Sequence, residues 1–129
     1  MKNTKQIIEE LPEILSNGKV DDSLIKETQE KLGVDFSEEY SDVLKHFGFL
    51  MYNGNRYLGI SRNGKYDLLS ATNEARLQDP DFPQNMYVIS NMGIDGILLL
   101  QDSCGHIYSY KKQCSLIKLS DSFIDYLNS

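Results

Sequence analysis

The chain has 129 residues, of which 40% are hydrophobic and 25% are charged, and its formal net charge at pH 7 is −6. These values predict a single globular domain over residues 1–129, large enough to bury about two thirds of the surface that its unfolded chain exposes. They exclude a disordered chain, which would combine few apolar residues with high charge. The negative charge argues against a broad basic face for nucleic acid or anionic lipid. It suits either a basic protein partner or solubility alone.

The N-terminal segment has the features of neither a secretory signal nor a membrane span. Two lysines precede Glu9 and Glu10, and no continuous apolar run follows them. The longest apolar runs elsewhere fall far short of the roughly 20 residues that cross a bilayer. We therefore expect a cytoplasmic protein. In the reducing cytosol, free thiols are favoured for Cys104 and Cys114, and a disulfide between them stays open as the alternative.

Apolar residues at three-to-four spacing predict that the first 48 residues are mainly helical. The expected helices run over Thr4–Leu15, from a cap at Asp21 or Asp22 to Leu32, and from a cap at Ser37 to Phe47. Pro12 predicts a kink or a break in the first helix, because proline lacks an amide donor and clashes with the preceding turn. Gly33 and Gly48 follow the other two helices, at positions where a left-handed cap costs least.

The third expected helix carries an acidic first turn and an apolar stripe. Glu38 and Glu39 favour its positive end, and we interpret them as a solvated first turn. Adjacent helical residues point about 100° apart, so the two carboxylates are not expected to form a catalytic pair. The apolar stripe consists of Tyr40, Val43, Leu44 and Phe47.

After Gly48 the pattern changes to short apolar stretches separated by turn residues. Asn53-Gly54 predicts a hairpin between Phe49–Tyr52 and Arg56–Ile60, because both turn residues accept positive φ angles at low cost. Asn63-Gly64 predicts a further turn. A short helix is then expected over Ser70–Gln78, with Ala71, Ala75 and Leu77 as candidates for its inward face. The two prolines in 79–83 predict a stiff surface loop after this helix.

The C-terminal half contains the clearest strand patterns. Three antiparallel strands are expected over Met86–Asn91, Ile97–Asp102 and His106–Lys111, with Leu116–Leu119 as a fourth and a terminal helix capped by Ser120 or Asp121. In the third strand Ile107 and Ser109 share one face, and Tyr108 and Tyr110 share the other, more polar face. The predicted fold class is α+β, with N-terminal helices packed on a curved, mainly antiparallel sheet.

The sequence contains no specific signature of catalysis, metal binding or phosphate binding. Cys104 and His106 are two residues apart, which is routine strand geometry and not the activation of a nucleophile. Asp95, Gly96 and Asp102 do not follow the ligand spacing of an EF-hand, and a hairpin turn explains them better. We therefore expect no cofactor, no metal and no enzymatic activity.

With these elements in place, residues 20–127 resemble the SUKH superfamily, the domain of the fungal cell-wall synthesis regulator that recurs among bacterial immunity proteins. The resemblance depends on Ile25–Gly33, on Phe36–Tyr40 with Leu44 and Phe47-Gly48, on the glycine-rich strands, and on Ser122–Leu127. It implies helices packed on a curved antiparallel sheet. In bacteria it also implies a protein that neutralises a toxin made by the same or a neighbouring cell.

Such toxins are often nucleases with basic substrate grooves, which an acidic inhibitor can approach by electrostatic steering. The expected partner is therefore a cognate protein toxin, with no nucleic acid, membrane or small-molecule substrate. Candidate contact residues are acids and an aromatic residue near turns: Asp79, Asp81, Asp95 and Tyr108. Their structural alternatives are loop formation for Asp79 and Asp81, a turn for Asp95 and sheet packing for Tyr108. The alternative function is a regulatory or scaffold domain that bridges cellular proteins.

Overall fold

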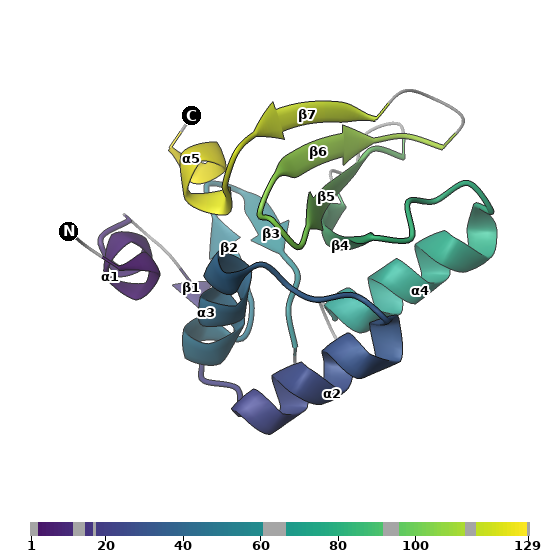
Figure 1. The fold of residues 1–129 in the computed structure, drawn as a ribbon. Helices are drawn as coiled ribbons and strands as arrows, with labels where there is room; N and C mark the ends of the chain where they lie inside the picture. Colours follow the sequence, from purple (N-terminus) through teal and green to yellow (C-terminus); the bar gives the residue numbers. More distant parts are fainter. Residues whose placement is uncertain are drawn as a thin grey trace.

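Short helices and antiparallel strands make up the computed structural model, which describes residues 3–11, 15–16, 18–60, 67–91, 96–112 and 116–128 (Figure 1). The helices are α1 (Thr4–Glu9), α2 (Asp22–Leu32), α3 (Glu38–Phe47), α4 (Leu68–Gln78) and α5 (Phe123–Leu127). The strands are β1 (Leu15–Ser16), β2 (Leu50–Tyr52), β3 (Asn55–Tyr57), β4 (Met86–Asn91), β5 (Leu98–Asp102), β6 (Ile107–Tyr110) and β7 (Ile117–Ser120).

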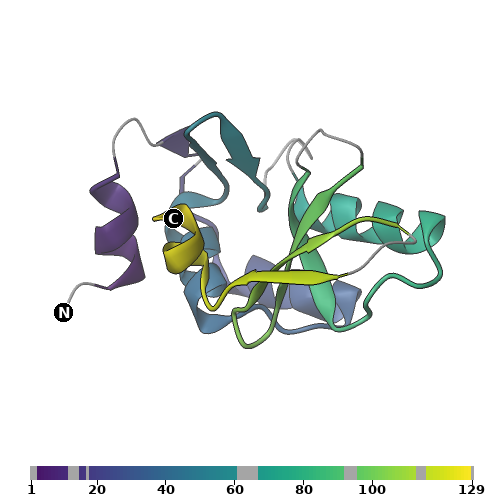
Figure 2. The same cartoon turned by 90° about the horizontal axis from the view of Figure 1, so that it is seen from above.

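The strands form two antiparallel sheets in chain order, β1-β2-β3 and β4-β5-β6-β7. The two sheets meet where β3 leads into the core. Leu58 N donates to Ile89 O over 2.7 Å, and Ser90 Oγ donates to Arg56 O over 2.7 Å. Figure 2 shows α1, α5 and both chain ends on one side of the molecule and α4 on the other. This arrangement confirms the predicted α+β class.

The second and third helices begin and end where the sequence predicts. Gly33 follows α2 with φ of 72°, in the left-handed region that glycine enters most easily. Ser37 caps α3 by accepting from Tyr40 N over 3.0 Å, which satisfies one of the amides left free at a helix start. The hairpin at Asn53-Gly54 is also confirmed, with φ angles of 54° and 82°.

A single hydrophobic cluster extends from Ile8 in α1 to Leu127 in α5 and includes the predicted α3 stripe. Aromatic rings join its parts. Phe123 makes edge-on contacts with Tyr40 and Tyr57 at centroid distances of 5.2 and 5.1 Å, and Phe36 makes one with Tyr87 at 4.8 Å. Such pairs add to the free energy gained by burial, so they fix helices and sheets to one another.

Three helix boundaries differ from the prediction. The first helix ends at Glu9, since Pro12 restricts the residues before it, and Leu15 lies in β1. The fourth begins at Leu68, because the Asp67 carboxylate accepts from Leu69 N. The fifth is capped by Ser122, whose Oγ accepts from Asp125 N over 3.0 Å. Ser120 and Asp121 precede this cap.

Three predictions of exposure were wrong. Leu77 is 87% exposed, because it lies about 200° around α4 from the inward-facing Ala75. In the 79–83 loop, Asp79 and Phe82 are buried, so this segment packs against the sheet as well as facing solvent. Tyr110 is also buried, against Phe82, which means that its sheet face is covered at that point. The predicted turn at Asn63-Gly64, and Cys114, lie outside the described residues.

Within the described ranges, none of the helices has the length and apolar character needed to span a bilayer.

Candidate functional site

A groove with a volume of about 440 Å³ opens where α1, α3, α5 and the β5–β6 turn meet. Its acidic side chains come from the first turns of α3. Glu38 is exposed, whereas Glu39 and Asp42 are half-buried. We call this feature the acidic groove. It is lined by Thr4, Ser37, Glu38, Glu39, Asp42, Ser103, Cys104, Gly105 and Ser122.

Glu39 does not behave as the solvated first-turn residue that the sequence predicts. Its carboxylate crosses to the start of α5, where it accepts from Phe123 N over 2.6 Å and from Ile124 N over 3.2 Å. Amides at a helix start lack partners within the helix and attract negative charge. The Glu39 carboxylate therefore gives these two amides hydrogen-bond acceptors and places a negative charge at the start of α5. Burial nevertheless raises the pKa of Glu39 above its ordinary value of 4.5, and the two amide hydrogen bonds oppose that rise. The prediction for Glu38 is confirmed.

Replacement of Glu39 by glutamine is expected to remove a pH dependence of stability. Because the folded pKa of Glu39 lies above its ordinary value of 4.5, ionisation is less favourable in the folded state. The wild type should therefore lose free energy of unfolding, relative to Glu39→Gln, as the pH rises from below 4.5 through the folded pKa. A constant cost of about 1 kcal/mol should accompany the variant, because its amide nitrogen cannot accept from an N–H group.

Urea unfolding of the wild type and Glu39→Gln between pH 4 and 8 measures this difference directly. The exposed neighbour provides the matched control, since Glu38→Gln removes a charge from the same helical turn. If the two variants show the same pH profile relative to the wild type, burial of Glu39 does not control its ionisation.

A buried hydrogen-bond chain holds the β5–β6 turn against the start of α3. The Tyr87 hydroxyl accepts from Ser37 N over 2.9 Å and donates to Gln101 Oε1 over 2.7 Å. Gln101 Nε2 in turn donates to Gly105 O over 3.0 Å. Burial raises the pKa of the Tyr87 hydroxyl, so it stays protonated and can donate. Two walls of the acidic groove are therefore joined through the protein interior.

Asp102 organises the turn itself. Its Oδ1 accepts from Cys104 N over 3.1 Å and from His106 N over 3.0 Å. Its Oδ2 accepts from the Tyr108 hydroxyl over 3.2 Å and lies 3.2 Å from His106 Nδ1. These bonds confirm that Asp102 belongs to a hairpin turn. Across the described parts of the chain, histidine, cysteine and carboxylate side chains nowhere form a group of three or more that could hold a metal ion.

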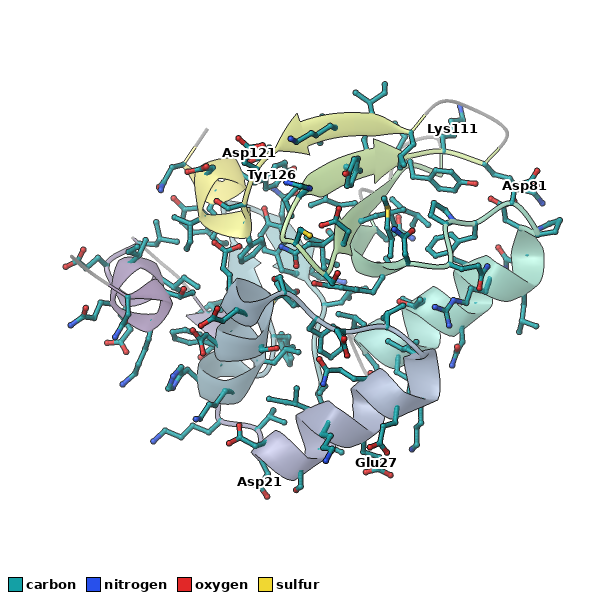
Figure 3. All side chains as sticks on the ribbon, in the orientation of Figure 1. Asp21, Glu27, Asp81, Lys111, Asp121 and Tyr126 are labelled. Atoms are coloured by element: carbon teal, nitrogen blue, oxygen red, sulfur yellow. The ribbon has the colours of Figure 1, made fainter. Side chains whose placement is uncertain are left out.

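The predicted contact residues occupy different environments. Asp79 is only 5% exposed, and it accepts from the Tyr110 hydroxyl and from Asp81 N. Asp81 is exposed in the same loop, far from Asp121 and the α5 side of the molecule (Figure 3). Tyr108 is half-buried in β6 and contacts Asp102. Asp95 lies outside the described residues.

The sequence did not reveal the acidic groove, because its walls come from four separate segments. Glu39 and Phe123 are 84 positions apart, and nothing in the spacing of either segment indicates their contact. The only sequence signal was the pair of acids after Ser37, which occurs at many helix starts. The pairing became visible only once the fold placed α5 beside α3.

Fold and groove together define a small α+β protein with a shallow acidic surface feature. The sequence profile of the SUKH_5 family, described as SMI1-KNR4 cell-wall, matches residues 4–129. The chain belongs to this family, which confirms the resemblance seen in its sequence. No curated protein matches the chain. Family membership fits either an immunity protein or a regulator of the SMI1-KNR4 kind, and it implies interaction with other proteins.

Proposed function

We propose that this protein is a non-enzymatic, cytoplasmic immunity protein that binds and neutralises a cognate bacterial toxin, with nucleases as the candidate toxin class. Family membership over residues 4–129 is the observation that carries the proposal. The net charge of −6 supports it, because nucleases have basic substrate grooves. An acidic inhibitor would be steered toward such a groove and would occupy the place of the nucleic acid.

Two surfaces are candidates for the toxin contact. The first is the acidic groove, where Glu38 and Asp42 face the opening beside the rigid β5–β6 turn. The second is the 79–83 loop, where Asp81 is the exposed acid among the contacts proposed from sequence; Asp95 stays a candidate from sequence alone. There Asp79 would act by shaping the loop that presents Asp81, because its own carboxylate is buried. Tyr108 donates to Asp102, the residue that organises the β5–β6 turn beside the first surface.

Co-expression with the toxin gene encoded beside this gene tests the function. Cells that carry the toxin alone should stop growing, and cells that also carry this protein should grow. The purified pair should form a complex whose affinity falls as salt is raised. If no neighbouring toxin is bound or neutralised, the proposal fails.

Charge reversal is expected to locate the surface. Glu38→Lys with Asp42→Lys should weaken toxin binding at least tenfold at low salt, because each lysine repels a basic partner. Asp81→Lys tests the second surface in the same way. Glu27→Lys is the control, since Glu27 lies on α2 away from both surfaces and makes an exposed ion pair with Lys31 (Figure 3). Equal binding by all these variants would exclude both surfaces.

The alternative function is a regulatory or scaffold domain, and the family description, SMI1-KNR4 cell-wall, favours it. Such a domain would bind several cellular proteins, and its deletion would change growth in a strain without the toxin gene. An immunity protein would show neither effect, so the deletion strain separates the two functions.

A further inference from the structure

Strand β7 is an open edge of the larger sheet. It pairs with β6 on one side, and within the described ranges no strand pairs with its other side. At the opposite edge of the sheet, the segment after β3 lies against β4, and Leu58 N donates to Ile89 O. Figure 1 shows β7 along the outer border of the sheet. Backbone amides and carbonyls on such an edge can accept another strand.

Apolar side chains gather on this edge. Leu116 is 39% exposed, Ile117 is 55% exposed and Leu119 is 47% exposed. Half of the large apolar residues that are exposed in the described structure therefore lie within four consecutive positions. Natural proteins usually protect an edge strand from pairing, so a concentration of apolar side chains there indicates an interaction surface.

The segment that contains β7 is basic in sequence, whereas the whole chain is acidic. Residues 111–121 contain Lys111, Lys112 and Lys118 but only one acid, Asp121, in a chain with a net charge of −6. Lys118 Nζ forms an ion pair with Asp121 Oδ1 at 2.6 Å, and Lys112 Nζ donates to Gln78 O over 2.6 Å. Two copies of this chain joined edge to edge would bring like charges together, which is unfavourable. An acidic occupant is favoured instead.

The alternation along β7 determines what sequence that occupant needs. Ile117 lies opposite Ser109, whereas Lys118 lies opposite Tyr108, so the two side chains are on different faces of the sheet. The register shifts between Lys118 and Ser120, so Leu119 is the extra residue of a bulge and has no partner in β6. A strand added beside β7 would place apolar residues next to Ile117, and acids next to Lys118.

We propose that β7 binds an extended segment of a protein partner, with alternating apolar and acidic residues, as an additional strand of the sheet. Main-chain hydrogen bonds would give this contact its affinity, and the Lys118 face would give it its preference for acids. The surface is separate from the acidic groove. The inference therefore goes beyond toxin neutralisation and does not depend on it.

A fluorescein-labelled nine-residue peptide of alternating valine and glutamate is the probe, and a valine–lysine peptide is its counterpart. Fluorescence anisotropy should show at least tenfold tighter binding of the glutamate peptide. Lys118→Glu should weaken that binding at least tenfold and reverse the preference. Hydrogen exchange of the amides in Ile117–Ser120 should slow when the glutamate peptide binds, because a new ladder protects outward-facing amides.

Lys31→Glu is the matched control, since Lys31 also makes an exposed ion pair, with Glu27, but lies on α2. It should bind the glutamate peptide like the wild type. No preference between the peptides, no effect of Lys118→Glu, or no protection of β7 would overturn the proposal. So would a dimer in light scattering whose formation blocks the peptide, because a second copy would then occupy the edge. Each of these failures leaves the toxin co-expression result unaffected.

Discussion

Gly59→Ala is expected to destabilise the protein by about 3 kcal/mol or more. A Cβ at Gly59 would lie 1.7 Å from Gly48 O and 2.7 Å from Gly48 C. Both atoms belong to the backbone and cannot rotate away, unlike the end of a flexible side chain. The new methyl group therefore requires the two segments to separate.

That separation would disrupt bonds on both sides of Gly59. Ile60 N donates to Gly48 O over 3.2 Å, and Leu68 N donates to Gly59 O over 2.7 Å. The first bond joins the segment to the end of α3, and the second joins it to the start of α4. Moving Gly59 would therefore weaken the attachment of both helices and leave buried polar groups unpaired.

Urea unfolding of Gly59→Ala and Gly54→Ala provides the measurement and its control. Gly54 has φ of 82° at the tip of the β2–β3 hairpin, and a Cβ there would meet no atom within 4 Å. Its replacement should cost only about 1 kcal/mol, from the left-handed backbone alone. If Gly59→Ala is no more destabilising than Gly54→Ala, the close approach to Gly48 does not constrain the fold.

The local elements of this fold could be predicted because their signals are local. Gly33 after a periodic apolar pattern, Ser37 before one and Asn53-Gly54 between two strands each determine backbone geometry within a few residues. The structure confirms all three. The family profile then confirms the resemblance that was built on the same segments.

The contacts between elements could not be predicted in this way. Glu39 was interpreted as solvated because a helix start is normally exposed, and only the placement of α5 makes it a buried acceptor. Asp79 was interpreted as a surface acid because it begins a loop that contains two prolines, yet the Tyr110 hydroxyl from β6 satisfies it in the interior. In both cases a distant partner compensated for burial of a carboxylate, and sequence spacing carries no information about that partner.

Tyr87→Phe is expected to cost about 3 kcal/mol, although it removes one oxygen atom and leaves the ring in place. The Tyr87 hydroxyl serves two buried partners, Ser37 N and Gln101 Oε1. Without it both groups are unpaired in a site where Ser37 is 3% exposed and Gln101 is fully buried. Each unsatisfied group adds a desolvation cost of about 1–3 kcal/mol to the lost bond.

Tyr108→Phe is the matched control, because it also removes a tyrosine hydroxyl that donates to a polar side chain, Asp102, but from a half-exposed position where water can replace it. That change should cost less than about 1 kcal/mol. Comparable losses in urea unfolding for the two variants would mean that the interior chain does not hold α3 to the sheet.

Tyr87→Phe should also alter the acidic groove without changing the charge of the groove. Gln101 Nε2 holds Gly105 O, and Gln101 is itself held by Tyr87, so loss of the hydroxyl should loosen the β5–β6 turn. Gly105 N, which donates to Asp102 O over 3.0 Å, should then exchange its hydrogen faster in Tyr87→Phe than in Tyr108→Phe. If the toxin contacts the groove, Tyr87→Phe should also weaken binding, because an interface that must first be ordered binds less tightly than a rigid one. Unchanged exchange at Gly105 would instead show that Asp102 alone fixes the turn.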